Sequence, residues 1–190
     1  MTPSARAAPA TIVTPRLSGR LPRASDIEYA RAIGADWQIQ KTLFERLWSE
    51  SECVERLERW TNAWQERGFG FWIFEDAAKA IVGHGGLFPS TQTPSDIELG
   101  YIVRTPFWGN GIATEIVQAA VAVAFDDMQL PALVANCMPE NAASRRVLEK
   151  CGFHFLFARR STTGATRTSN TAAQPRGNLV ESSRPTRSIP

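Results

Sequence analysis

The feature that most constrains this chain is a glycine turn between a predicted strand and a predicted helix. The strand covers 97–104 and the helix begins at Ile112, with Gly109 and Gly111 in the turn that joins them. Glycine adopts backbone angles closed to other residues and leaves room for a ligand against the main chain. The first turn of a helix also exposes unpaired N–H groups at the positive end of its dipole. The turn is therefore either an anion site, such as one for phosphate, or a tight connection without a ligand.

Two further segments complete this central stretch, which runs from Ile97 to Phe153. Residues 130–137 are largely apolar and predict a second buried strand. Residues 139–153 predict a loop, then a helix, then a stop at a glycine. The stretch as a whole thus predicts strand, turn, helix, strand, helix in that order.

Three short motifs in this stretch carry a resemblance to a known family. They are Trp108-Gly109-Asn110-Gly111-Ile112-Ala113-Thr114-Glu115, Asn141-x-x-Ser144 and Glu149-Lys150-Cys151-Gly152-Phe153. In this order and at this spacing the chain resembles the GNAT superfamily of acyl-CoA-dependent N-acyltransferases. Within it, the motifs are similar to the RimJ/RimL-type branch that acetylates protein N-termini, notably of ribosomal proteins. The resemblance covers roughly Thr14 to Phe157.

The predicted elements give an α/β fold with a mixed, mostly antiparallel central sheet flanked by helices. Strands are expected at 69–75, 80–88 and 97–103, joined as hairpins and followed by a helix and a parallel strand. A first strand is expected to begin at Thr14–Leu17. A helix is expected from Ile27 until Gly34, and another from a serine cap at 49 or 51 to Arg67, with Val54 among its core-facing residues.

The two ends of the chain differ in composition from the middle. We expect 1–13 to be a disordered N-terminus, 14–158 to be the acetyltransferase domain and 159–190 to be a disordered basic tail. From Arg159 onward there are six Arg and one Glu, which leaves 15 basic and 18 acidic residues in the rest of the chain. A segment so poor in large apolar residues does not offset its ordering entropy. The last hairpin of the sheet is therefore expected to be incomplete, which would leave an unpaired edge that favours a homodimer.

Composition excludes several classes of protein. The chain has 190 residues and 43% hydrophobic residues, as one globular domain requires. No run approaches the ~18 apolar residues of a membrane span. The N-terminal residues lack the apolar core of a secretory signal. The three cysteines have no metal-type spacing, so we expect free thiols, no metal and a cytoplasmic protein. Only the tail is basic, and it has no interleaved aromatics, so nucleic acid is not an expected partner.

The resemblance implies which residues hold acetyl-CoA as co-substrate. Main-chain groups of Leu99, Tyr101 and Val103 would pair with the pantetheine arm as a false strand. The pyrophosphate would contact the backbone of Trp108, Gly109, Asn110, Gly111, Ile112 and Ala113. The resemblance also places Asn141 against the arm near the sulfur, although an asparagine here is equally a helix cap.

Transfer of an acetyl group to an amine requires a neutral amine, so a nearby base is useful. Glu98 is our candidate, because related enzymes often carry a glutamate on the strand that leads to the phosphate turn. It could instead only brace a loop or an arginine. His84 is the second candidate, since histidine titrates near neutrality. Ser144 is our candidate acid for the leaving thiolate.

Two departures from the family pattern bear on these roles. The residue that commonly opens the phosphate motif as Gln or Arg is Pro106 here, which removes one N–H donor. Many relatives carry a tyrosine at the position of Leu148, where it acts as the acid that protonates the leaving thiolate. Here Ser144 or water must take over that role. Both departures lie inside the expected site.

We therefore expect an N-acetyltransferase that moves an acetyl group from acetyl-CoA to a primary amine by direct attack. A protein N-terminal or lysine amine is the preferred acceptor. A small-molecule amine, such as an aminoglycoside or polyamine, is the first alternative. A non-catalytic acyl-CoA-binding protein is the second, and transfer assays beside CoA binding distinguish it.

Overall fold

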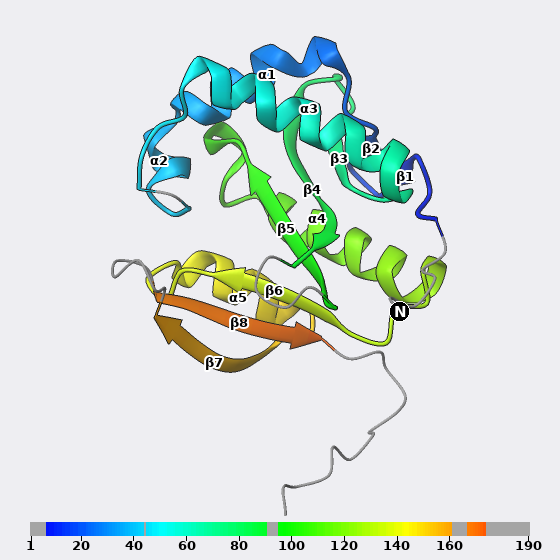
Figure 1. Ribbon diagram of the computed structural model, residues 1–190, viewed down its shortest axis with the longest axis vertical. Helices are drawn as coiled ribbons and strands as arrows, with labels where there is room; N and C mark the ends of the chain where they lie inside the picture. Colours follow the sequence, from blue (N-terminus) through cyan, green and yellow to red (C-terminus); the bar gives the residue numbers. More distant parts are fainter. Residues whose placement is uncertain (1–6, 44, 91–94, 161–166, 174–190) are drawn as a thin grey trace, which may run out of the picture.

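The computed structural model describes residues 7–43, 45–90, 95–160 and 167–173, and its strands form one mixed sheet (Figure 1). The strands are β1 Ile12–Val13, β2 Ser18–Arg20, β3 Phe71–Glu75, β4 Ile81–Pro89, β5 Ile97–Val103, β6 Leu133–Cys137, β7 His154–Arg160 and β8 Arg167–Ala173. Their order across the sheet is β1-β2-β3-β4-β5-β6-β8-β7. All neighbours pair antiparallel except β5 and β6, which are parallel. The predicted mixed α/β architecture is confirmed.

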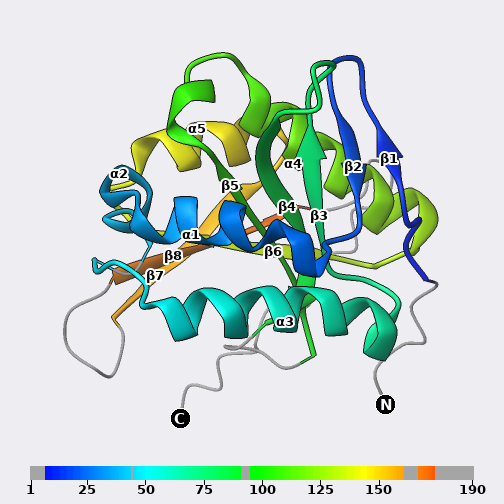
Figure 2. The same cartoon turned by 90° about the horizontal axis from the view of Figure 1, so that it is seen from above.

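Helices cover both faces of this sheet. They are α1 Ile27–Ala35, α2 Trp37–Gln40, α3 Glu50–Arg67, α4 Ile112–Ala122 and α5 Ala142–Lys150, with short turns η1 Ala24–Asp26, η2 Thr105–Phe107 and η3 Val123–Asp127. Figure 2 shows α1 and α3 on one face and α4 and α5 on the other. Alternate strand residues feed two apolar clusters, one under α1 and α3 and one under α4 and α5.

The N-terminal hairpin differs from the prediction. Thr14–Leu17 is a turn between β1 and β2 and not the start of a strand, and Ile12 pairs with Gly19 across it. Pro15 cannot donate a hydrogen bond, whereas the Thr14 main chain and hydroxyl both bond to Leu17. The chain already contacts the sheet before residue 14, since β1 covers Ile12–Val13 and the carbonyl of Pro9 accepts a hydrogen bond from the Trp72 indole.

The long helix α3 begins and ends as predicted. Ser49 and Glu52 form a reciprocal capping box at its start, and Gly68 takes a left-handed conformation, φ 72°, at its end. Leu57 and Trp60 are buried on the sheet. Val54, expected in the core, is exposed, because it lies on the solvent side of the buried stripe. The first helix, α1, continues through the expected stop at Gly34 to Ala35.

A close approach between α4 and β4 fixes where the glycine turn at 109–111 lies. A Cβ atom added at Gly85 of β4 would lie 2.3 Å from Cγ2 of Ile116 on α4. Glycine here therefore lets the helix press directly on the sheet. Ile116 is fully buried, and the same helix face buries Val117 and Ala120. This packing holds the N-terminus of α4 at the end of β5.

The expected incomplete hairpin is corrected by the structure. β8 lies between β6 and β7 and pairs antiparallel with both, with Thr171 opposite Ala135 on one side and Phe155 on the other. Main-chain hydrogen bonds on two sides need no apolar side chains, and Thr favours strands. A polar segment can thus supply the last strand. The remainder of the predicted basic tail, 161–166 and 174–190, lies outside the described residues.

Candidate active site

The glycine turn presents a run of free main-chain donors. Gly109 and Gly111 have φ values of 79° and 76°, a region that favours glycine. Among the described residues, the N–H groups from Gly109 to Thr114 have no hydrogen-bond acceptor. The run ends at Glu115, whose N–H bonds to the carbonyl of Gly111. This arrangement, at the positive end of α4, is a nest for an anion.

The carbonyl groups of the same turn are held away from that nest. The side-chain amide of Asn110 donates to the carbonyl of Trp108 at 3.1 Å and lies 3.4 Å from that of Phe107. The Trp108 indole donates to the carbonyl of Val103 at 2.7 Å. Pro106 belongs to η2, upstream of the free donors, so the proline does not interrupt the run.

Beside the turn, the two parallel strands separate. β5 pairs with β6 only at Glu98 with Val134 and at Leu99 with Ala135. Beyond Leu99, β5 keeps its partners on β4 as far as Val103, whereas its other edge has no register with β6. Of the predicted contact residues, Tyr101 and Val103 lie along this edge, whereas Leu99 still pairs with Ala135 at its start. The edge can accept one extended segment of ligand.

Glu98 lies at the point where the strands begin to separate. Its side chain is on the face of the sheet that α1 and α3 cover, because neighbouring Leu99 packs into the cluster on the other face. It is 9% exposed, and Ser90 Oγ donates to its carboxylate at 3.0 Å. Burial raises the pKa of Glu98, although hydrogen bonds with Asn136 and Ser90 partly oppose this.

Ser144 and Tyr101 meet on the opposite face of the sheet. The Tyr101 hydroxyl lies 2.8 Å from Ser144 Oγ, and burial raises the pKa of Tyr101. Asn141 caps α5 by accepting the N–H of Ser144 at 3.0 Å. Sequence reasoning assigned only the backbone of Tyr101 to the site. Its side-chain contact with a residue 43 positions away had no local signal.

His84, the second candidate base, lies in the core. Its Nδ1 is 2.8 Å from the Tyr29 hydroxyl, and the rings of Trp60 and Phe71 surround it. It is 3% exposed, and burial lowers its pKa to about 3, with a smaller effect of Arg56. A histidine so enclosed serves packing.

A further groove lies next to the first turn of α4, and Glu115 is among its lining residues. It is a groove of about 440 Å³ between the N-terminal hairpin and α4, lined among others by Ile12, Pro15 and Ala119. Within the described ranges no group of His, Cys, Asp or Glu could hold a metal ion. None of the helices described there is long and apolar enough to cross a membrane.

A mixed sheet with one separated parallel pair, next to a glycine turn that opens a helix, is the arrangement expected of the family that the sequence motifs resemble. The sequence matches the family model described as Acetyltransferase (GNAT) domain over residues 16–154. The chain therefore belongs to the GNAT family of N-acetyltransferases.

Two proteins of Bacillus subtilis are similar in sequence. The uncharacterized protein YkkB is 31% identical over 131 residues, which cover 61% of this chain and 76% of YkkB. The protein named probable N-acetyltransferase YjcK is 34% identical over 105 residues, 55% of each chain. This chain thus spans about half the length of YjcK.

Solved structures share the fold at low sequence identity. A GNAT-family acetyltransferase from Bacillus anthracis gives a TM-score of 0.75 at 21% identity, over 86% of this chain and 98% of that one. RimL, a ribosomal L7/L12 alpha-N-protein acetyltransferase in complex with coenzyme A, gives 0.71 at 16%, over 86% and 97%. A chimera of the spermidine N-acetyltransferase SpeG from Vibrio cholerae gives 0.67 at 16%, over 83% and 95%.

Proposed function

We propose that this enzyme transfers the acetyl group of acetyl-CoA to a primary amine of a protein or peptide, by direct attack of the amine. The observation that carries the proposal is the separation of β5 from β6 beside the free N–H groups of the turn, with buried Glu98 where the separation starts. The backbone donors and the unpaired edge of β5 would bind acetyl-CoA, and the carboxylate would act on the amine that attacks it.

The free N–H groups of 109–114 would bind the pyrophosphate of acetyl-CoA, and the β5 edge from Leu99 to Val103 would pair with its pantetheine arm. A main-chain N–H on this edge would polarise the thioester carbonyl. RimL, which shares this fold, is in complex with coenzyme A, which supports coenzyme A as a ligand here. Asn141 already accepts a hydrogen bond from Ser144, which leaves its amide N–H₂ able to contact the arm.

Glu98 would take the proton that the attacking amine loses. Its raised pKa makes its carboxylate a stronger base than an exposed glutamate. The amine nitrogen bonds to the acetyl carbon, the carbon–sulfur bond breaks, and the sulfur leaves with the bonding electron pair. Because Glu98 faces α1 and α3, the acceptor would approach from that side of the sheet.

The pair Tyr101 and Ser144 would supply a proton to the departing sulfur. Their hydroxyls are 2.8 Å apart and lie on the face of α4 and α5, opposite Glu98. Leu148 occupies the position at which many relatives carry a tyrosine that protonates the thiolate, and Tyr101 would take that role here. The base and the acid would thus act from opposite faces of the sheet.

The preference for a protein acceptor rests on the motifs shared with the N-terminal acetylating branch and on the fold shared with RimL. The likeness to a spermidine N-acetyltransferase supports a polyamine as the second candidate. A thiol-release assay with acetyl-CoA against peptides, polyamines and aminoglycosides decides between them. We expect turnover with peptides. Turnover with polyamines alone would select the second candidate, and CoA binding without any turnover would select a non-catalytic protein.

A further inference from the structure

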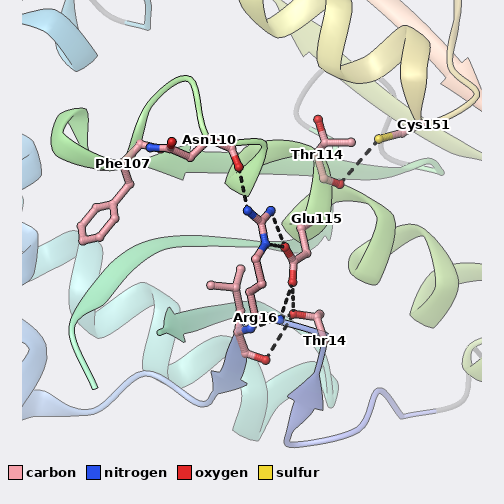
Figure 3. A network of polar contacts seen from close by, with 8 residues as sticks. Thr14, Arg16, Phe107, Asn110, Thr114, Glu115 and Cys151 are labelled. Atoms are coloured by element: carbon pink, nitrogen blue, oxygen red, sulfur yellow. Dashed lines mark hydrogen bonds and ion pairs between the residues drawn. The ribbon is translucent and has the colours of Figure 1, made fainter. Parts of the chain in front are cut away.

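One ion pair connects the N-terminal hairpin to the phosphate turn (Figure 3). Arg16 lies in the turn between β1 and β2, and Glu115 lies in the first turn of α4. The guanidinium Nε and Nη2 both lie 2.6 Å from Oε2 of Glu115. The main-chain N–H of Arg16 and the hydroxyl of Thr14 donate to Oε1, at 2.9 Å and 2.6 Å.

These contacts matter because a carboxylate occupies the end of the helix where an anionic ligand should bind. A free negative charge at the first turn of α4 would compete with the pyrophosphate for the positive helix end and repel it. Glu115 is instead saturated with donors on both oxygens and only 12% exposed. Burial alone would raise its pKa, but the bonds from Thr14 and Arg16 lower it overall, so it stays charged.

Arg16 also acts on the backbone of the turn itself. Its Nη1 donates to the carbonyl of Asn110 at 2.8 Å, which turns that acceptor away from the free N–H groups. Its Nη2 lies 3.5 Å from the position a Cβ atom would have at Gly111. The guanidinium is half-exposed, and both of its contacts to acceptors of the turn and of α4 are already made within the protein.

We propose that Arg16 is a positioning residue for the cofactor: it sequesters the carboxylate of Glu115 and the carbonyl of Asn110, so that the phosphate turn offers only donors to CoA. The proposal rests on the proposed cofactor site. The β1–β2 hairpin thereby becomes part of the CoA site, although Arg16 lies outside the glycine motif.

The test is a double-mutant cycle read by calorimetric titration with CoA. Arg16→Met keeps the apolar stem and removes the charge, so Oε2 of Glu115 loses both of its donors while Oε1 keeps the main-chain N–H of residue 16 and the Thr14 hydroxyl. The charge of Glu115 is then no longer neutralised, and CoA should bind at least about tenfold more weakly. Glu115→Gln removes the competing charge, and CoA should bind as tightly as to the parent or more tightly. The double variant should recover to within about threefold of the parent.

A matched control is Arg31→Met. Arg31 is similarly exposed and pairs with Glu28 and Glu50, on the α1 and α3 side, away from the turn. The Arg31→Met variant should bind CoA with the affinity of the parent. The Arg16→Met defect should also shrink in high salt, appear in KM for acetyl-CoA and leave KM for the acceptor unchanged.

Each outcome is informative. A double variant as weak as Arg16→Met alone would overturn the proposal, because Arg16 would then act on the phosphate directly. Equal CoA affinity of Arg16→Met and the parent would also overturn it and leave the proposed function intact. Failure of the parent to bind CoA would overturn both. Thermal unfolding of each variant checks that the folded protein is being titrated.

Discussion

At the scale of single residues, the proposed site contains one buried carboxylate and one hydroxyl pair on opposite faces of the sheet. Glu98 is held by Ser90 and Asn136, neither of which any sequence motif indicated. The buried Oδ1 of Asn136 has no partner among the described residues.

Glu98→Gln should lower turnover at neutral pH by roughly 10² or more, the cost of a lost general base. CoA affinity should hardly change. The acid limb of the parent pH–rate profile should lie above the ordinary carboxyl pKa, because burial raises that of Glu98. Steady-state rates between pH 5 and 9 measure both effects. A variant that keeps the parent rate and profile would make Glu98 structural.

The same substitution should not destabilise the fold at neutral pH. The folded state binds the Glu98 proton more tightly than the unfolded chain does, since the folded pKa is raised. The carboxyl therefore stabilises the protein in acid, and this contribution is lost as pH rises from the ordinary value of 4.5 through the raised one. Thermal unfolding at pH 7 should show Glu98→Gln equal to or more stable than the parent. A clear loss would contradict this.

Tyr101→Phe removes the hydroxyl that faces Ser144 and keeps the ring. We expect kcat to fall by roughly 10-fold to 10²-fold, at the lower end of general acid catalysis, with CoA binding retained. An activated thioester with a better leaving thiol should be less affected, because its sulfur needs no proton. Ser144→Ala is the matched variant. Equal rates for parent and Tyr101→Phe on both thioesters would remove the pair from the mechanism.

At the scale of elements, the glycine turn before α4 combines a backbone conformation, a helix terminus and a close helix–sheet contact. Because Gly85 has no side chain, Ile116 packs directly on β4 and α4 lies close to the sheet. The free N–H groups at the start of α4 therefore lie beside the point where β5 and β6 separate. The turn is thus positioned by the core. Its glycines supply the conformation, and the packing supplies the direction.

Gly111→Asp should abolish CoA binding, because it places a negative charge where the pyrophosphate should lie. Gly111→Asn is the control: asparagine tolerates the left-handed conformation and carries no charge. Calorimetric titration should show the Asp variant at least about tenfold weaker than the Asn variant. Equal affinities would attribute any loss to backbone strain and move the anion elsewhere.

At the scale of the whole molecule, the sheet is continuous because β8 joins β6 to β7. Without β8 the end of the sheet that contains β7 would have no strand pairing with β6 in the described part of the chain. An unpaired edge of this kind favours association between copies. The polar segment 167–173 therefore has a structural role that its composition hides.

Thr171→Pro should lower the free energy of unfolding by about 3 kcal/mol or more, since Thr171 pairs on both sides and proline cannot donate. Thr171→Val keeps the N–H group and should change stability by less than about 0.5 kcal/mol. Denaturant unfolding measures both. A proline variant as stable as the parent would show that β8 contributes nothing to the folded state.

Sequence alone determined the elements whose signals are local. The capping box and terminal glycine of α3, the hairpins β3-β4-β5 and the glycine turn before α4 follow from spacing that lies within one element or its neighbour. These patterns act over a few residues, through backbone angles and hydrogen bonds that adjacent positions control. The family resemblance and the predicted cofactor residues belong to the same local stretch.

Only the tertiary structure decided which distant groups meet. Arg16 and Glu115 are 99 positions apart, Tyr101 and Ser144 are 43 apart, and β8 enters between two strands that precede it. His84 became a core residue because α1 and α3 close over it. Such contacts depend on the order of strands and the packing of helices, and the free energy that selects them is summed over the whole core, so no short segment encodes them.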